Sequence, residues 1–165
     1  MKKVQTAVIG YGFAGRSFHS YLVGLVPDMT LRGICTGNPE RQTQARAERS
    51  CRIYREFQEV LDDDGVDLVV LATPNATHCE LAVRALDAGK NVVTDKIMCL
   101  NLGEYRQMTE AAERNGKLLS VFQNRRWDGD YLTLKKVMED GLLGDVRHLE
   151  MAWQGLGAWA GRWRG

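Results

Sequence analysis

Three glycines near the start of the chain have the spacing of a phosphate cradle. Gly10, Gly12 and Gly15 stand in the stretch AVIGYGFAGRSFH, residues 7–19, just after the apolar run 4–9. In a strand-to-helix turn, the first glycine permits the tight turn, the second lets backbone N–H groups approach a pyrophosphate, and the third lets the helix pack closely on the strand. The helix N-terminus adds partial positive charge. The alternative is a glycine-rich turn that holds no ligand, because GxGxxG alone is a weak signal.

The residues about 20 positions further on would decide which dinucleotide such a cradle holds. A carboxylate there would accept hydrogen bonds from the ribose hydroxyls of NAD, but the chain has Cys35, Thr36, Gly37 and Asn38, with Arg41 close behind. Thr36 and Asn38 could hydrogen-bond a 2′-phosphate, and Arg41 could pair with it. The sequence therefore favours NADP over NAD. The alternative role for Arg41 is a solvated charge on a helix surface.

An alternation of strands and helices surrounds these residues. Strands are expected at 4–9, 31–35, 53–54, 68–72, 91–94, 118–122 and 146–153, and helices at 13–25, 39–50, 56–61, 75–88, 101–115 and 131–139. This order predicts right-handed βαβ crossovers and a parallel sheet covered on both faces. The fold class is therefore α/β, a doubly wound parallel sheet of the Rossmann type, over residues 1–122. The character of the chain changes at 123, and all four tryptophans lie beyond that point.

Four signals mark helix ends within this alternation. Asn38 followed by Pro39 indicates an N-cap with proline at the first helical position. Asn101 with Glu104 three residues later predicts a capping box. Gly89 and Gly116 are placed to end helices in the left-handed conformation.

Composition limits the class of partner. The chain has 165 residues, with 22 basic and 21 acidic side chains and a formal net charge of +1. This gives no basic stripe for nucleic acid or an anionic membrane, so a small molecule is the expected partner. The four cysteines form no CxxC pair and no metal-ligand spacing, which favours reduced thiols, no metal and a cytoplasmic location. The apolar run before Gly10 is too short for a signal peptide or a membrane span.

Two longer stretches join the opening motif in pointing to one family. They are ATPNATHCELAVRALDAGKNVVTDK at 72–96 and SVFQNRRWDGDYLTLKKVMEDGLLGDVRHLE at 120–150. Together the three stretches resemble the Gfo/Idh/MocA oxidoreductases, in particular the branch that includes NADP-linked scyllo-inositol dehydrogenases. The resemblance implies that residues 123–165 begin a second α/β domain, most of which lies outside the chain, that binds a polyol or sugar and forms the interface of a homo-oligomer. The implied reaction is hydride transfer between NADP or NAD and a secondary alcohol of a sugar or of a cyclitol such as an inositol.

The resemblance also implies roles for single residues. Lys96 matches the lysine of the family's Glu/Asp-Lys-Pro motif and is the expected catalytic residue, since a lysine there could assist proton transfer at the substrate oxygen. Asp95 could orient it. His78 either lines the site or caps local backbone, Trp127 either approaches the nicotinamide or packs at the domain boundary, and His19 is expected to pack. The residues expected to hold the cofactor are Gly10, Gly12, Phe13, Ala14, Gly15, Thr36, Asn38, Arg41, Thr73, Pro74, Asn75, His78, Asp95, Lys96, Asn124 and Trp127.

Two departures from the family pattern keep a second hypothesis open. The family motif ends in proline, whereas here Ile97 follows Lys96. Isoleucine favours a trans peptide bond, which would aim Lys96 less accurately. The family's downstream acid/base Asp and His would fall beyond Gly165. The alternative to an enzyme is therefore a dinucleotide-binding module or regulator without catalysis.

Overall fold

The computed structural model describes residues 2–152, and the chain divides into two compact units, 1–123 and 124–165. The strands of the first unit are β1 (Val4–Ile9), β2 (Met29–Cys35), β3 (Arg52–Tyr54), β4 (Leu68–Leu71), β5 (Asn91–Thr94) and β6 (Leu119–Val121). Its α-helices are α1 (Ser20–Leu25), α2 (Pro39–Glu48), α3 (Phe57–Leu61), α4 (His78–Asp87) and α5 (Leu102–Asn115). A π-helical turn, Gly15–His19, leads into α1, and a 3-10 turn, Asn75–Thr77, leads into α4.

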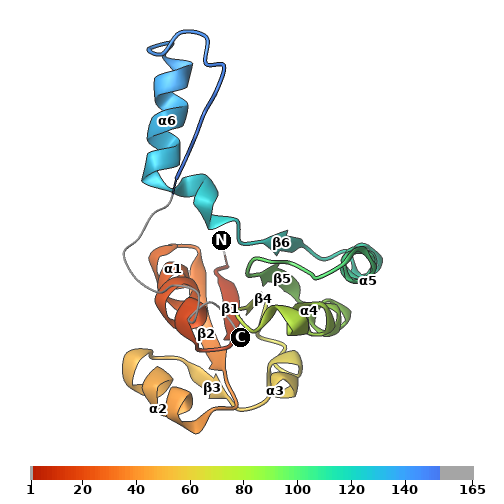
Figure 1. The fold of residues 1–165 in the computed structure, drawn as a ribbon. Coiled ribbons are helices and arrows are strands. Elements are labelled where there is room, and N and C mark those ends of the chain that lie inside the picture. Colours follow the sequence, from red (N-terminus) through yellow and green to blue (C-terminus); the bar gives the residue numbers. More distant parts are fainter. Residues whose placement is uncertain (1, 153–165) are drawn as a thin grey trace. The chain divides into compact units, whose positions relative to one another are not determined.

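The six strands form one parallel sheet in the order β3-β2-β1-β4-β5-β6. Figure 1 shows α1 and α2 on one side of this sheet and α3, α4 and α5 on the other. The strand order reverses direction between β1 and β4, which is the switch point where doubly wound sheets bind ligands. The predicted Rossmann fold is confirmed.

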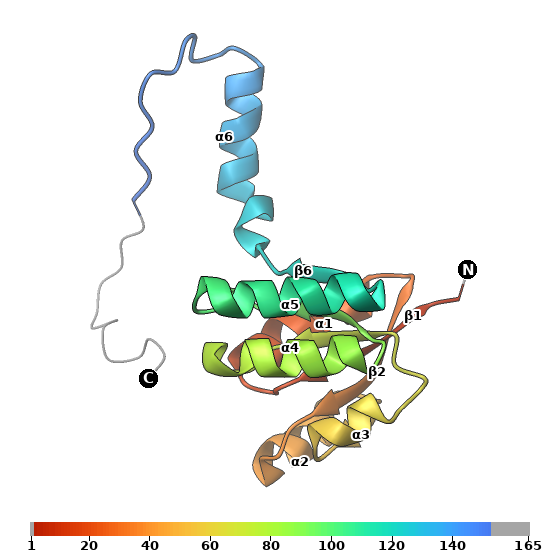
Figure 2. The same ribbon diagram turned by 90° about the vertical axis from the view of Figure 1, so that its right-hand side faces the viewer.

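Burial explains why the carboxyl halves of the two strands at the switch point are apolar. Ala7, Val8 and Ile9 of β1 and Val69 and Leu71 of β4 are buried. Helices cover both faces of a parallel sheet, so side chains on both sides of a central strand must be apolar. On one of these faces α4 and α5 lie side by side (Figure 2). The carboxyl ends of β1 and β4 therefore lie in the buried core of the unit.

The predicted helix ends are confirmed. The Asn38 side chain accepts a hydrogen bond from the Arg41 N–H at 3.0 Å, and the Asn101 side chain accepts one from the Glu104 N–H at 2.9 Å. Gly89 and Gly116 have φ angles of +76° and +59°. These positive values are available to glycine at little cost, so both helices end where the sequence indicates.

The second unit holds a 3-10 turn, Asn124–Trp127, and helix α6, Gly129–Glu139. The strand expected at 146–153 is wrong for its described part, because 146–152 have no regular secondary structure. A strand needs neighbouring backbone groups with which to pair, and residues 124–152 contain no strand. Trp153, Trp159 and Trp163 lie outside the described residues. Between residues 2 and 152, no helix has both the length and the apolar character needed to cross a membrane.

A buried carboxylate ties the edge of the sheet to the loop before β4. Asp63, with a side chain 8% exposed, accepts two hydrogen bonds from Arg32 of β2, at 2.7 and 3.0 Å. It also accepts one from the Tyr54 hydroxyl of β3 at 2.7 Å and one from the Gly65 N–H at 2.9 Å. Arg32, and then Tyr54 and Gly65, hold the pKa of Asp63 well below its usual range. The loop is thus fastened to two strands through one charged group.

Asp63→Asn is expected to lower the free energy of unfolding at pH 7 by about 2–3 kcal/mol, because Arg32 and Tyr54 lose their charged acceptor. The lowered pKa means that the carboxylate stabilises the fold fully above its unfolded value of about 3.9 and loses this effect as pH falls toward the folded value. The difference between wild type and variant should therefore begin to shrink below about pH 5 and continue to shrink as the pH falls below 3 toward the folded pKa. Urea unfolding at several pH values measures it. Asp64→Asn, at the exposed neighbour, is the control, and equal effects of the two changes would contradict the prediction.

Candidate functional site

The turn after β1 places its glycines where side chains would collide with backbone. Gly10 has a φ of +93°, and a Cβ there would lie 2.6 Å from the carbonyl oxygen of Ala72, the residue after β4. A Cβ on Gly15 would overlap the Gly10 carbonyl oxygen. Both glycines are therefore required by close approach of backbone, which agrees with their expected roles in the turn and in helix packing.

Gly12 differs from the other two because its surroundings are open. The nearest atoms to a Cβ built at this position belong to the Arg41 guanidinium, with Nη1 at 3.7 Å. No backbone closes the space, so a ligand phosphate could approach Gly12 once the flexible arginine makes room. Phe13 and Ala14, the first helical residues after the turn, carry N–H groups that have no partner inside the helix. The residues present therefore fit the pyrophosphate of a dinucleotide.

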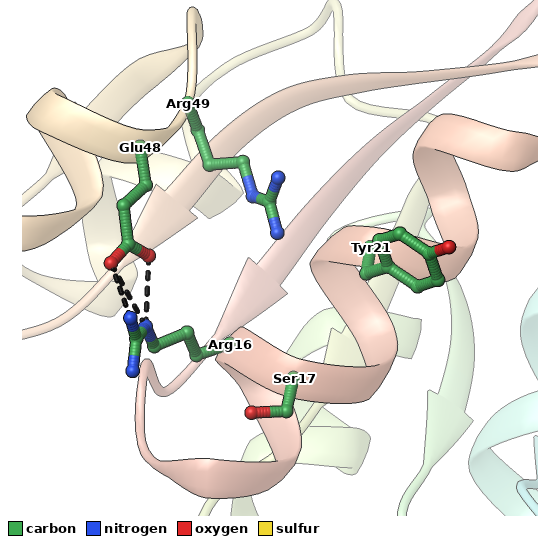
Figure 3. Close-up of a pocket in the computed structure, with 5 residues that line it drawn as sticks. All are labelled: Arg16, Ser17, Tyr21, Glu48 and Arg49. Atoms are coloured by element: carbon green, nitrogen blue, oxygen red, sulfur yellow. Dashed lines mark hydrogen bonds and ion pairs between the residues drawn. The ribbon is translucent and has the colours of Figure 1, made fainter.

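An ion pair between Arg16 and Glu48 joins the glycine turn to α2. Arg16 donates to Glu48, the last residue of α2, through Nη2 at 2.6 Å and Nε at 2.8 Å, and the Tyr11 hydroxyl donates to Glu48 at 2.9 Å. The hydrogen bonds from Arg16 lower the pKa of Glu48 to about 2. Figure 3 shows the Arg16–Glu48 pair at a hollow that is lined also by Ser17, Tyr21 and Arg49. None of these residues is a predicted cofactor residue, and the pairing joins positions 32 residues apart that have no local sequence signal.

The three residues expected to select the cofactor follow β2, with Thr36 and Asn38 in the turn and Arg41 in α2. Thr36 is buried, and its hydroxyl accepts from the Asn38 N–H at 3.4 Å. The Asn38 side chain caps α2, so its Oδ1 already accepts a hydrogen bond from the helix backbone. Arg41 is exposed, and its guanidinium reaches over Gly12. Arg41 is the one charged residue of the three, and its guanidinium lies exposed beside the cradle.

His78 joins the loops that follow β4 and β5. It is completely buried, with Nε2 3.0 Å from the Thr73 carbonyl oxygen and Nδ1 2.7 Å from the Ile97 carbonyl oxygen. Both partners are carbonyl oxygens, which only accept, so a ring nitrogen donates to its partner when it carries a proton. This arrangement corresponds to backbone capping. It ties the expected cofactor loop, Thr73-Pro74-Asn75, to the segment that bears Lys96.

Lys96 follows β5 and is half-buried, and its N–H donates to Asp95 Oδ1 at 2.8 Å. The Lys96–Ile97 peptide bond is cis, so the expectation of a trans bond is wrong. The carbonyl of Ile97 is held by His78 and the N–H of Lys96 by Asp95, and these hydrogen bonds on either side fix the local backbone. The segment therefore has defined partners although the family's proline is missing.

The structure brings together the glycine turn, Arg41, and the loops after β4 and β5 at the carboxyl edge of the sheet. Asn124 and Trp127 belong to the second unit and are described only within it, where Trp127 is exposed. His19, expected only to pack, does pack edge-on against Phe122, with ring centroids 4.6 Å apart, but it also faces Asp95. Its distance from residue 95 along the chain explains why sequence reasoning missed this contact. Among the described residues, no group of three or more His, Cys, Asp and Glu side chains could hold a metal ion.

Comparisons with known proteins agree with this geometry. The model of the Gfo/Idh/MocA oxidoreductase family, described as an NAD-binding Rossmann fold, matches residues 4–123. The uncharacterized oxidoreductase YdgJ of Escherichia coli is 38% identical over 148 residues, which cover 89% of this chain and 42% of YdgJ. The scyllo-inositol 2-dehydrogenase (NADP⁺) IolW of Bacillus subtilis is 32% identical over 150 residues, which cover 91% of this chain and 41% of IolW.

A solved structure extends the comparison to three dimensions. The crystal structure of an NAD-binding protein from Listeria innocua superposes with a TM-score of 0.81 at 37% identity, covering 87% of this chain and 42% of that one. The chain thus spans less than half the length of the relatives it matches.

Proposed function

Because the chain belongs to the Gfo/Idh/MocA family of oxidoreductases, we propose that its first unit holds NADP or NAD for hydride transfer to or from a small alcohol. The observation that carries this proposal is the open space at Gly12, at the switch point of the sheet, between two glycines that backbone contacts require. A Rossmann sheet without a ligand would not need an open position there. The bound cofactor would supply the hydride chemistry itself.

The residues of this chain would position the reacting groups. The turn at Gly10, Gly12 and Gly15 would hold the pyrophosphate, and the loop at Thr73-Pro74-Asn75 would lie beneath the cofactor. Lys96 would hydrogen-bond the substrate oxygen, accept the hydroxyl proton as the alcohol is oxidised, and return a proton to this oxygen as the carbonyl is reduced. The Lys96 N–H donates to Asp95 Oδ1 at 2.8 Å, and this hydrogen bond limits the directions that the Lys96 side chain can take.

The names of the relatives support a proposal for the substrate class. IolW is named a scyllo-inositol dehydrogenase, and it aligns over 91% of this chain. The substrate proposed for this protein is therefore a sugar or a cyclitol such as an inositol. In this proposal, residues from 123 onward begin the domain that binds the substrate and forms a homo-oligomer.

NADP is the preferred cofactor in this proposal. The turn after β2 has no carboxylate to repel a 2′-phosphate, and the exposed Arg41 lies over the cradle. A guanidinium in this place could form charge-assisted hydrogen bonds with the phosphate. Thr36 and Asn38 would add hydrogen bonds from the same turn.

The test is a titration of the purified chain with NADPH and, separately, with NADH, followed by the fluorescence of the reduced nicotinamide. Arg41→Ala is expected to weaken NADPH binding by about 10- to 100-fold, the loss expected for a charged hydrogen bond, and to leave NADH binding nearly unchanged. Arg46→Ala, at another exposed arginine of α2, is the control. Equal losses for both cofactors would remove Arg41 from 2′-phosphate recognition, and a folded chain that binds neither would contradict the proposed function.

A further inference from the structure

A buried histidine nitrogen beside the lysine segment has no hydrogen-bond partner. His19, at the end of the π-helical turn, is 4% exposed, and its Nε2 is fully enclosed. Its ring packs edge-on against Phe122 at the end of β6. Buried polar atoms are nearly always satisfied, so an unsatisfied one requires an explanation.

The group that faces this nitrogen is Asp95. Nε2 of His19 lies 3.9 Å from Oδ2 of Asp95, while Oδ1 of the same carboxylate accepts the Lys96 N–H at 2.8 Å. Asp95 is itself only 7% exposed. One carboxylate therefore stands between the imidazole and the backbone of the lysine.

We propose that His19 is a positioning residue, which orients Asp95 and through it Lys96; its catalytic consequence rests on the proposed function. The distance of 3.9 Å exceeds that of a hydrogen bond, and a small movement of either side chain would close it. Hydrogen bonds in active sites are often long before ligands bind and tighten afterwards. The π-helical turn, closed by the Ser20 N–H on the Gly15 carbonyl, supplies the position of the ring, and such turns are frequent at functional sites.

Packing alone does not account for a histidine here. The contact with Phe122 needs an aromatic ring but no ring nitrogen, and phenylalanine would fill the same space without an unsatisfied polar atom. A role through Asp95 needs the N–H and not the aromatic ring. The two interpretations therefore make opposite predictions for two substitutions.

The experiment compares His19→Phe, which keeps a ring but has no donor, with His19→Gln, whose amide can donate from a similar position. The readouts in the free chain are the NMR chemical shift and hydrogen exchange of the Lys96 amide, and the midpoint of thermal unfolding. We expect His19→Phe to shift the Lys96 resonance and to speed its exchange by about tenfold, with little change in the midpoint. His19→Gln should keep both values for Lys96 close to wild type.

The opposite pattern would overturn the proposal: an undisturbed Lys96 amide in His19→Phe, with loss of stability confined to His19→Gln. Asp95→Asn provides an independent measurement, because the ring-nitrogen resonance of His19 should move in that variant if the imidazole contacts the carboxylate. An unchanged resonance would count against the contact even if the His19 variants fail to fold.

Turnover in the full-length protein then tests the catalytic consequence. His19→Phe should lower kcat by about 10- to 100-fold, as for a misaligned catalytic group, with little change in KM, and His19→Gln should restore most of it. NADPH and NADH titrations of the same variants keep the two proposals apart. If wild type binds neither cofactor, the proposed function fails, while the Lys96 amide still reports whether His19 positions it.

Discussion

Gly15→Ala is expected to lower the free energy of unfolding by about 2–4 kcal/mol and to abolish measurable cofactor binding. The added methyl group would overlap the carbonyl oxygen of Gly10, and Gly10 is held in place because its N–H donates to the Cys35 carbonyl of β2 at 2.8 Å. The turn and the start of the following helix must therefore move apart. Urea unfolding gives the stability change, and titration with NADPH and NADH gives the change in binding.

Gly24 provides the matched control, and Gly12 provides a second test of the cradle in which the fold should be kept. Gly24, in α1, has no atom within 4 Å of a Cβ position, so Gly24→Ala should leave binding unchanged and raise stability by up to about 1 kcal/mol through helix propensity. Gly12→Ala meets only the Arg41 side chain. It should keep the fold but weaken binding, because the methyl group would occupy the space left for the pyrophosphate. Wild-type affinity in both Gly12→Ala and Gly15→Ala would show that the cradle is not the cofactor site.

Lys96→Ala is expected to lower turnover of the full-length protein by about 10²–10⁴-fold, the usual loss when a group that moves a proton is removed. Cofactor affinity should change little, because the proposed contact is with the substrate oxygen. The measurements are steady-state kinetics with a cyclitol or sugar substrate, and cofactor titration of the same variant.

Lys3→Ala, at the exposed start of the chain, is the control for loss of a lysine. Unchanged turnover in Lys96→Ala would take this residue out of the mechanism. Saturable cofactor binding without any turnover in the wild-type protein would favour the second hypothesis, a dinucleotide-binding module without catalysis.

Local signals in the sequence were sufficient to predict most of the strands and helix ends of the first unit. Asn38 and Asn101 each cap the helix that follows, and Gly89 and Gly116 end helices with positive φ angles. Each of these features depends on residues within one turn of each other, which the sequence displays directly. The apolar run 68–72 likewise predicted a central strand, and β4 occupies 68–71 of it.

The features that could not be predicted join residues that are far apart in the chain. Asp63 with Arg32, Glu48 with Arg16, and His19 with Asp95 are all placed by the sheet and its crossovers, not by their neighbours in sequence. The expected strand at 146–153 was wrong over 146–152 for a related reason. Alternation of apolar residues indicates a strand only where another strand is available to pair with it.

The strand order places the residues proposed for coenzyme preference apart from the segment that carries Lys96, so that an engineer could change one without the other. The residues proposed to choose between NADP and NAD follow β2, on one side of β1, whereas His78 links the segments after β4 and β5 on the other side. Under the proposed function, we therefore expect changes at 36–41 to alter coenzyme preference without disturbing the hydrogen bonds between His78 and the segment that carries Lys96. The loops after β4 and β5 share one imidazole, so replacement of His78 should change cofactor retention and reaction rate together.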